Sequence, residues 1–315
     1  MQYRRFGKTD LQISEIGFGS WAIGGNSFGN VEKSDALAAL ARAEELGCNF
    51  VDTAAVYGNA ESILGEFLQG RRQKWVVATK YSSQKLDMET TIKQQLERLK
   101  TDYIDFYQIH WAPSDHELYE KLYRLKESGL VRYVGVSLSS RNDIDYVINK
   151  TEIDGFQVPM SLVQPNPLMN KVKQIEAKGL GVIVRSCLAN GFLTGKYSEQ
   201  SQFNDPNDQR SHYSTEKIAS LVSNARNFDC LTSENLSLTQ TAINYTLAIA
   251  QVSSVILSTK NDTQASENFL ASQDHALTDE QLAKIHQIQK SMGVLDYSLK
   301  ENFRYWLSGL KQKLK

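Results

Sequence analysis

Four side chains that can hold or transfer protons follow short apolar runs of the chain: Asp52, Tyr57, Lys80 and His110. A phenol has an ordinary pKa of about 10 and is therefore a slow acid at neutral pH. A cationic lysine beside it favours the phenolate and lowers that pKa, and a carboxylate keeps the lysine charged. A histidine can donate a hydrogen bond to a carbonyl oxygen. Such a set protonates an oxygen that becomes negative as a hydride, supplied by a cofactor, reaches its carbon.

Each of these residues has a simpler structural interpretation when it is taken alone. Asp52 can cap the turn that follows it, and Lys80 can be a solvated charge at the end of a strand. Tyr57 can be an aromatic residue at the rim of a pocket, and His110 a hydrogen-bonded histidine without a catalytic role. The catalytic interpretation therefore depends on a fold that brings all four side chains together.

Short apolar segments alternate with segments of helical periodicity, which is typical of βα units around a parallel sheet. The predicted strands are Ile16–Trp21, Cys48–Asp52, Trp75–Lys80, Ile104–His110, Val131–Ser137, Gly155–Pro159, Gly181–Arg185 and Val252–Ser258. The clearest predicted helices are Ser34–Leu46, Met88–Lys100, His116–Ser128, Asn142–Asn149, Lys171–Lys178, Leu238–Ala250 and Thr263–Ala271.

Residues that begin and end helices support these boundaries. Asp87 and Asp115 precede two predicted helices and can accept hydrogen bonds from their first backbone N–H groups. Three glycines follow helix ends, where a left-handed conformation suits glycine: Gly47, Gly129 and Gly179. The sequence Thr278–Gln281 is a capping box, which predicts a further helix after the eighth unit.

These elements predict an α/β fold, a (β/α)₈ TIM barrel with an N-terminal β-hairpin and additional C-terminal helices, in one domain over residues 1–315. The hairpin is expected at Tyr3–Phe6 and Leu11–Ser14, and residues 197–235 are interpreted as a polar insertion after the seventh strand. A doubly wound sheet is the alternative, but the early glycines lack the GxGxxG spacing. In a barrel, the four proton-handling residues converge at the carboxyl ends of neighbouring strands.

The composition narrows the class of protein. Lys and Arg number 35 and Asp and Glu 36, so no charge of one sign favours nucleic acid or a membrane surface as partner. Three widely spaced cysteines without a CxxC motif are typical of a reducing compartment, and the N-terminus lacks a signal peptide, so a cytoplasmic location is expected. The scattered histidines form no HxH or HExxH motif, so no metal is expected.

The motifs around the four residues resemble those of the aldo-keto reductases along nearly the whole chain. Val51–Gly58 resembles that family's Asp-Thr-Ala-x-x-Tyr-Gly segment, Val76–Lys80 its strand ending in Ala-x-Lys, and Gln108–Trp111 its His-Trp strand end. The resemblance implies that Tyr57 donates the proton, that Lys80 and Asp52 support it, and that His110 orients the substrate. It also implies that Trp21 and Trp111, with Phe28, line the substrate mouth, over which Phe303–Leu307 can fold if that segment does not instead dock on the barrel's flank.

The resemblance also implies a nicotinamide cofactor, NADPH in preference to NADH. Ser137 and Gln157 would hold the carboxamide, and Arg185 stands where many members stack an aromatic ring on the nicotinamide. The glycine-rich stretch Gly191–Tyr197 resembles the family's pyrophosphate loop, and the 2′-phosphate is expected at the end of the eighth strand. The complete set of expected cofactor contacts is Ser20, Trp21, Asp52, Ser137, Gln157, Arg185, Ser186, Leu188, Asn190, Gly191, Lys196, Ser258, Thr259, Lys260, Gln264, Glu267 and Asn268.

Two other classes of function remain open at the level of sequence. A barrel aldolase would use Lys80 as a Schiff-base nucleophile. A cofactor-sensing regulatory subunit would keep the fold without significant turnover. The main hypothesis is reduction of a small aldehyde or ketone, or the reverse oxidation, and the sequence leaves the substrate and the oligomeric state open.

Overall fold

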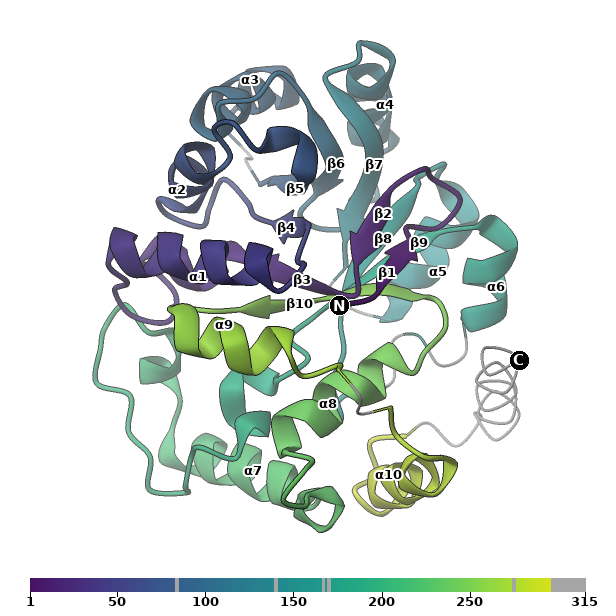
Figure 1. Cartoon of the computed structure of the whole chain (residues 1–315). Helices are drawn as coiled ribbons and strands as arrows, with labels where there is room; N and C mark the ends of the chain where they lie inside the picture. The colour runs from purple at the N-terminus through teal and green to yellow at the C-terminus, as the bar shows by residue number, and fades with distance from the viewer. Residues whose placement is uncertain (83–84, 139–140, 166–167, 169–170, 274–275, 296–315) are drawn as a thin grey trace.

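Eight parallel strands form a closed barrel in the computed structural model, which describes residues 1–82, 85–138, 141–165, 168, 171–273 and 276–295 (Figure 1). They are β3 (Ile16–Gly19), β4 (Phe50–Asp52), β5 (Val76–Tyr81), β6 (Ile104–Ile109), β7 (Val131–Ser137), β8 (Gly155–Pro159), β9 (Gly181–Arg185) and β10 (Val252–Ser258). Each strand pairs with the next along the chain, and β10 pairs with β3. The predicted barrel is confirmed, and the doubly wound alternative is wrong.

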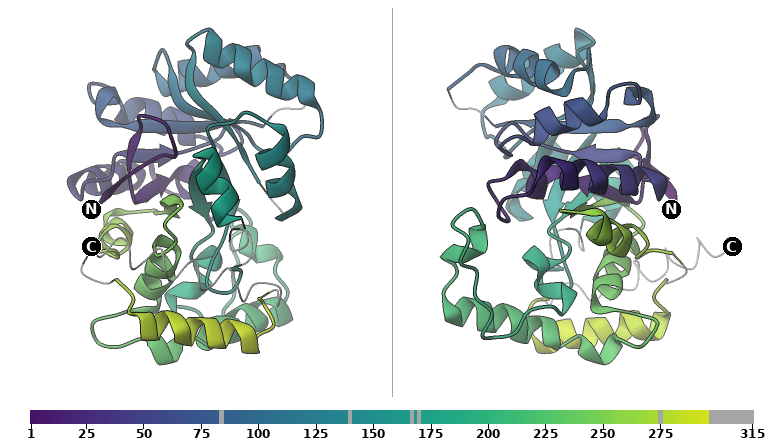
Figure 2. Two further views of the ribbon diagram at one scale, coloured as in Figure 1. Left: turned by 90° about the vertical axis from the view of Figure 1, so that its right-hand side faces the viewer. Right: turned by 60° about the vertical axis from the view of Figure 1, so that its left-hand side comes forward.

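Helices surround the barrel in every view (Figures 1 and 2). Those that follow a strand are α1 (Lys33–Glu45), α2 (Ala60–Phe67), α3 (Met88–Leu99), α4 (His116–Glu127), α5 (Arg141–Lys150), α6 (Val172–Lys178), α8 (Leu238–Leu247) and α9 (Asp262–Phe269). Asp87 accepts from the backbone N–H of Thr90 and Asp115 from that of Glu117, as predicted. The three glycines after helix ends have φ of +89°, +79° and +63°. Helix α2 was not among the clear predictions.

The N-terminal hairpin closes one end of the barrel. Its strands β1 (Tyr3–Arg5) and β2 (Gln12–Ser14) are antiparallel, and Phe6 packs into the barrel interior against Phe106 with ring centroids 4.7 Å apart. A Cβ atom at Gly155 or Gly181 would lie 2.3 Å from the Phe6 ring, so both strands need glycine there. The predicted hairpin is therefore confirmed, and its apolar plug leaves the opposite end of the barrel for chemistry.

The insertion after β9 carries more regular structure than its polar sequence predicted. It contains the 3₁₀ turn η4 (Gln209–His212) and the 12-residue helix α7 (Thr215–Arg226). The hydroxyl of Ser214 caps α7 by accepting from Lys217 N–H, and the helix buries Ile218 and Val222 against Phe192. The interpretation of residues 197–235 as an insertion is confirmed. Helix α7 was missed because the insertion was described as weakly periodic. Its small apolar cluster needs only a few apolar residues on α7, so the helical pattern in the sequence is weak.

Two backbone hydrogen bonds tie the insertion to the loop that follows β3. Gly29 N–H donates to Asn207 O at 3.2 Å, and Gln209 N–H donates to Ser27 O at 2.9 Å. These loops are far apart in the chain, and they meet beside the carboxyl end of the barrel. We call residues 203–213 the strap, because they bridge the β9 and β3 sides of the molecule.

The last described helix, α10 (Asp279–Ser291), lies beside α8 on the outside of the barrel (Figure 2). Thr278 and Gln281 form the predicted capping box. The aromatic segment Phe303–Leu307 lies outside the described residues. Among the residues that are described, no helix is long and apolar enough to cross a membrane, and no group of His, Cys, Asp or Glu is placed to hold a metal ion.

Candidate active site

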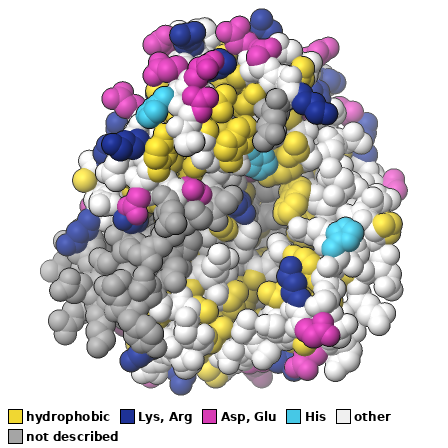
Figure 3. Space-filling model, turned by 180° about the vertical axis from the view of Figure 1, so that it is seen from behind, with side chains coloured by type: hydrophobic (Ala, Val, Ile, Leu, Met, Phe, Trp, Pro, Cys, Tyr) yellow, Lys and Arg dark blue, Asp and Glu magenta, His cyan; other side chains and the backbone are white. Residues whose placement is uncertain are grey.

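A cavity of about 500 Å³ lies at the carboxyl ends of the strands, where barrel enzymes build their active sites. The view from behind shows hydrophobic side chains around the hollowed centre of this side, with Lys or Arg side chains also beside the hollow and other charged side chains toward the periphery (Figure 3). Asp52, Tyr57 and His110 all line the cavity, so the fold brings these three predicted residues together. Lys80 lies directly behind them and is fully buried.

Lys80 and Asp52 form a buried ion pair beneath the cavity. The ammonium of Lys80 donates to Asp52 Oδ1 at 2.5 Å and to the carbonyl oxygen of Thr53 at 2.8 Å. The other carboxylate oxygen accepts from Gln108 Nε2 at 3.1 Å and from Gln157 Nε2 at 2.9 Å. A buried charge needs such partners, so this network fixes both charged groups in place.

Tyr57 lies above this pair in the loop that follows β4. The Lys80 ammonium is 5.0 Å from the centre of the Tyr57 ring, and the rings of Trp21 and His110 are each 5.9 Å away. The loop reaches this position because two glycines allow close backbone contact. A Cβ at Gly24 would lie 1.9 Å from Tyr57 O, and Gly58 has a φ of +53°.

The protonation of Tyr57 differs from the sequence-based expectation. Burial raises the pKa of its phenol above the ordinary value of 10.0, and the Lys80 charge opposes that shift. Lys80 acts to lower the pKa of Tyr57, as predicted. The predicted net lowering of that pKa is wrong, because the rise caused by burial is larger than the effect of Lys80. The phenol is therefore protonated at neutral pH, and Lys80 stabilises the phenolate only once it forms.

His110 follows β6 and is held from one side by Ser82. The hydroxyl of Ser82 lies 2.8 Å from His110 Nδ1. Burial, followed by the charges of Lys80 and Arg185, lowers the pKa of His110 to about 3. The imidazole is therefore neutral at physiological pH and has one N–H. If the Ser82 hydroxyl donates to Nδ1, that N–H is on Nε2 and can donate to a carbonyl oxygen.

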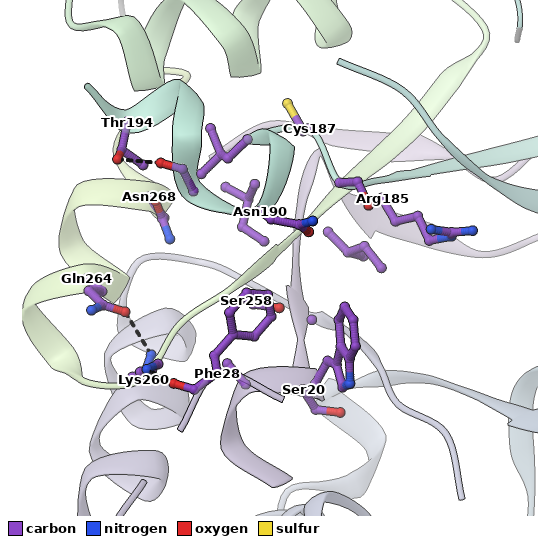
Figure 4. A pocket seen from close by; sticks show the side chains of 18 of the residues that line it. Ser20, Phe28, Arg185, Cys187, Asn190, Thr194, Ser258, Lys260, Gln264 and Asn268 are labelled. Carbon is purple, nitrogen blue, oxygen red and sulfur yellow. Dashed lines mark hydrogen bonds between the residues drawn. The ribbon is translucent and has the colours of Figure 1, made fainter. Parts of the chain in front are cut away.

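Most of the expected cofactor contacts line one continuous cavity (Figure 4). The predicted residues in its wall are Ser20, Trp21, Asp52, Gln157, Arg185, Ser186, Leu188, Asn190, Gly191, Lys196, Ser258, Lys260, Gln264, Glu267 and Asn268. Ser137 and Thr259 are buried behind the wall and do not line it. Trp111, predicted to contact substrate, also lies outside the wall and packs on Tyr81 with ring centroids 5.9 Å apart.

Two polar atoms in the cavity wall suit an amide-bearing ligand. Because the Asp52 carboxylate can only accept, the amide of Gln157 directs its nitrogen there and leaves Oε1 as a free acceptor. This oxygen and the hydroxyl of Ser20 are buried and have no hydrogen-bond partner among the described residues. A carboxamide that donates to Gln157 Oε1 would satisfy it, so these residues fit a nicotinamide.

At the other end of the cavity, β10 leads into α9. Asn261 caps α9 by accepting from Gln264 N–H, and the Gln264 side chain accepts from Lys260 N–H at 3.0 Å (Figure 4). The ammonium of Lys260 donates to Phe28 O. Across the cavity, Lys196 pairs with Glu267 at 2.9 Å. The cavity therefore ends in basic groups and a helix N-terminus, which together suit a phosphate.

The loop between these two ends has unusual backbone conformations. Ser186, Ala189 and Asn190 have φ values of +59°, +48° and +56°. Positive φ is uncommon for residues other than glycine and concentrates at binding sites. This backbone carries the η3 turn (Ala189–Thr194) past the cavity, where Asn190 is fixed by donating to Tyr213 OH at 2.9 Å.

Sequence reasoning missed the residues that the strap adds to the wall. The guanidinium of Arg210 pairs with Asp208 at 2.6 Å, donates to Tyr197 OH at 2.7 Å, and lies 4.2 Å from the centre of the Phe203 ring. No local pattern reveals these contacts, because they depend on how the insertion folds back. Gln108 and Ser82 were also missed, although each lies two residues from a predicted catalytic residue and alternation along a strand places such neighbours on one face.

The fold and the site together define one class of protein, a closed parallel barrel with a buried Lys–Asp pair beneath a tyrosine at the carboxyl ends of its strands. The family model for the Aldo/keto reductase family matches residues 15–290, and the chain belongs to that family. The family assignment made from the motifs around the four residues is thereby confirmed.

Similar proteins extend along nearly the whole chain. An uncharacterised oxidoreductase of Bacillus subtilis, YqkF, is 32% identical over 308 residues, which cover 92% of this chain and 97% of the relative. The holo form of the aldo-keto reductase AKR11C1 from Bacillus halodurans superposes with a TM-score of 0.76 at 26% identity, covering 91% of this chain and 96% of that one. A probable voltage-gated potassium channel subunit beta of Oryza sativa is 29% identical over 86% of this chain and 91% of the relative.

Proposed function

We propose that the protein is an NADPH-dependent carbonyl reductase in which Tyr57 is the general acid. The observation that carries this proposal is the buried Lys80–Asp52 pair under a protonated phenol, in one cavity with His110 and with the free acceptor of Gln157. In this proposal an acid, a cation that stabilises its conjugate base, and a hydrogen-bond donor act together on one carbonyl oxygen.

In the proposed reaction, Tyr57 O–H and His110 Nε2–H both donate to the carbonyl oxygen of the substrate. When bound, the reduced nicotinamide would supply the hydride. As the oxygen becomes negative, Tyr57 transfers its proton to it, and the phenolate that remains is stabilised by Lys80. Trp21 and Phe28 pack against each other in the cavity wall, and a bound substrate that displaces water there would strengthen these electrostatic effects. Gln157 and Ser20 would hold the carboxamide, and Lys260 and Ser258 the 2′-phosphate.

The test is a panel of aldehydes and ketones screened for loss of NADPH absorbance by the purified protein. At least one carbonyl compound is expected to be reduced, with loss of activity in Tyr57→Phe. A protein that binds NADPH but turns over no member of a broad panel would instead support the second candidate, a cofactor-sensing subunit, which the similarity to the rice channel subunit motivates.

The aldolase hypothesis is disfavoured by the position of Lys80. Its ammonium is fully buried, does not line the cavity, and is held by Asp52 and the Thr53 carbonyl. A Schiff-base lysine must be neutral and must reach the substrate. Borohydride treatment in the presence of a carbonyl compound is therefore expected to leave Lys80 unmodified.

The cysteines support the proposal of a cytoplasmic protein. All three are free thiols, and burial raises the pKa of Cys48 to about 11 and that of Cys187 to about 12. Buried, protonated thiols are unreactive packing groups, and unpaired cysteines are typical of reducing compartments.

Replacing Lys260 with alanine is expected to weaken NADPH binding by about tenfold while leaving NADH binding nearly unchanged, because only NADPH has the 2′-phosphate. Isothermal titration calorimetry with NADPH and with NADH measures both affinities. The preference of the wild type for NADPH over NADH should shrink at high salt. An equal loss for both cofactors would show that Lys260 acts through its hydrogen bond to Phe28 O, as a structural residue.

Ser82 is expected to fix the tautomer of His110. Ser82→Ala should lower kcat/KM by about two- to tenfold, the effect of one neutral hydrogen bond, whereas Ser82→Thr should retain activity. Ser82→Asp should raise the pKa of His110 by adding a neighbouring carboxylate, and so move the acid limb of the pH profile upward into the mildly acidic range. Imidazole ¹⁵N shifts, assigned with His110→Gln, give the tautomer directly. A protonated Nδ1 in the wild-type protein would refute the assignment.

A further inference from the structure

The cations in the cavity wall are not all paired. Lys196 pairs with Glu267, Arg210 with Asp208, and Lys80 beneath the wall with Asp52. Within the described part of the chain, Arg185 and Lys260 line the same cavity but belong to no ion pair. Figure 4 shows them at opposite ends, with Ser258 and Asn190 between them. Each end of the cavity therefore has one cation without a direct ion-pair partner among the described residues.

Arg185 lies at the catalytic end. It is the last residue of β9, opposite Pro159 of β8, and its Nη2 donates to the carbonyl oxygen of Leu138 at 3.1 Å. Its charge acts on the catalytic groups, because it contributes to the lowered pKa of His110 and opposes the rise in the pKa of Tyr57. Burial lowers the pKa of Arg185 itself, and the nearby Tyr57 and Asp52 only partly oppose that shift.

The inference rests on the proposed function. The hydride must reach a carbonyl carbon that Tyr57 and His110 hold, so the nicotinamide ring has to lie at the catalytic end, within electrostatic range of Arg185. The reduced ring is neutral, whereas the oxidised ring has a positive charge. The phosphates at the Lys260 end do not change charge with redox state. The two cations are therefore expected to respond differently to oxidation of the cofactor.

We propose that Arg185 makes the pocket selective for the redox state of the cofactor, so that NADPH binds more tightly than NADP⁺. Two unit charges a few ångströms apart in a partly buried site repel strongly enough for a difference of about tenfold or more. Lys80 also lies at this end, but its charge is paired with Asp52 beneath the wall, whereas Arg185 lines the cavity and has no ion-pair partner there. The consequence is that oxidised cofactor leaves readily after reduction, and that the free enzyme is loaded with NADPH even when both forms are present.

The experiment is a calorimetric titration of NADPH and of NADP⁺, each without a carbonyl substrate, into the wild type and three variants. Wild type is expected to give a Kd ratio, NADP⁺ over NADPH, of about ten or more. Arg185→Gln removes the charge but keeps a planar donor for Leu138 O, and should bring the ratio close to one, chiefly by tightening NADP⁺. Arg185→Lys keeps the charge and should retain the ratio.

Lys260→Ala is the matched control at the other end of the same cavity. It should weaken both redox forms by the same factor and leave the ratio unchanged. The proposal for Arg185 is overturned by either of two results. One is a Kd ratio in Arg185→Gln that equals the wild-type ratio, and the other is a Kd ratio in Arg185→Lys that falls close to one. Wild-type protein that binds both nucleotides equally also overturns the proposal for Arg185 while the proposed function stands. Failure of NADPH to bind overturns the proposed function.

Discussion

Replacing Tyr57 with phenylalanine is expected to lower kcat for carbonyl reduction by at least about 100-fold, the usual cost of losing a general acid. The substitution removes one hydroxyl and keeps the ring, so the contacts with Trp21 and His110 and the Lys80 ammonium below the ring should persist. Cofactor affinity should therefore barely change. Steady-state kinetics on the best aldehyde of the panel, together with NADPH titration, separate the two effects.

The pH dependence of the wild type provides an independent check of this role. Reduction needs a protonated phenol, so activity is lost as pH rises through the pKa of Tyr57, which burial raises above 10.0. His110, with its pKa lowered to about 3, remains neutral through the same range. Reduction should therefore be nearly independent of pH from about 6 to 9. Near wild-type activity in Tyr57→Phe would show that another group donates the proton.

Replacing Lys80 with methionine is expected to affect both catalysis and stability. Breaking a buried ion pair from one side leaves Asp52 charged without a counterion, which should lower the free energy of unfolding by about 3–5 kcal/mol. The phenolate of Tyr57 also loses its stabilising cation, so the pKa of Tyr57 should rise further and kcat should fall by about 100-fold or more. Chemical denaturation and steady-state kinetics measure the two losses.

A double variant separates these effects. Adding Asp52→Asn to Lys80→Met removes the uncompensated charge and keeps an acceptor for the amides of Gln108 and Gln157. Stability should largely return, whereas activity should not. For alcohol oxidation, which needs the phenolate, the rise of activity with pH should move to higher pH in Lys80→Met. An unchanged pH profile at measurable activity would remove Lys80 from its proposed role.

The barrel was predictable from sequence because its signals are local. Four strands have the predicted bounds, including Val131–Ser137 and Val252–Ser258, and the others differ by a few residues at their ends. Parallel strands in a barrel share one carboxyl end, so Asp52 and His110 had to come close once the strands were assigned. The assignment of residues 1–315 to one domain remains a prediction, as do the functional roles of the site residues.

What the sequence did not predict depends on contacts between distant residues. Arg210 meets Phe28 only because the insertion folds back across the cavity, and their guanidinium and ring lie 5.2 Å apart. The upward pKa shift of Tyr57 arises from burial, which no neighbouring residue in the chain reveals. Trp111 adjoins His110 in sequence, yet it turns to pack on Tyr81 instead of lining the cavity.

The carboxylate of Asp52 joins two halves of the barrel that have different tasks. It accepts from Lys80 on β5 and Gln108 on β6, and also from Gln157 on β8. The proposed acid and its support come from β4 to β6, whereas most proposed cofactor contacts come from β8 to β10. Recombination between related barrels could therefore exchange the cofactor half as a module and retain the proton-transfer chemistry, provided that the incoming half restores an amide donor at the position of Gln157.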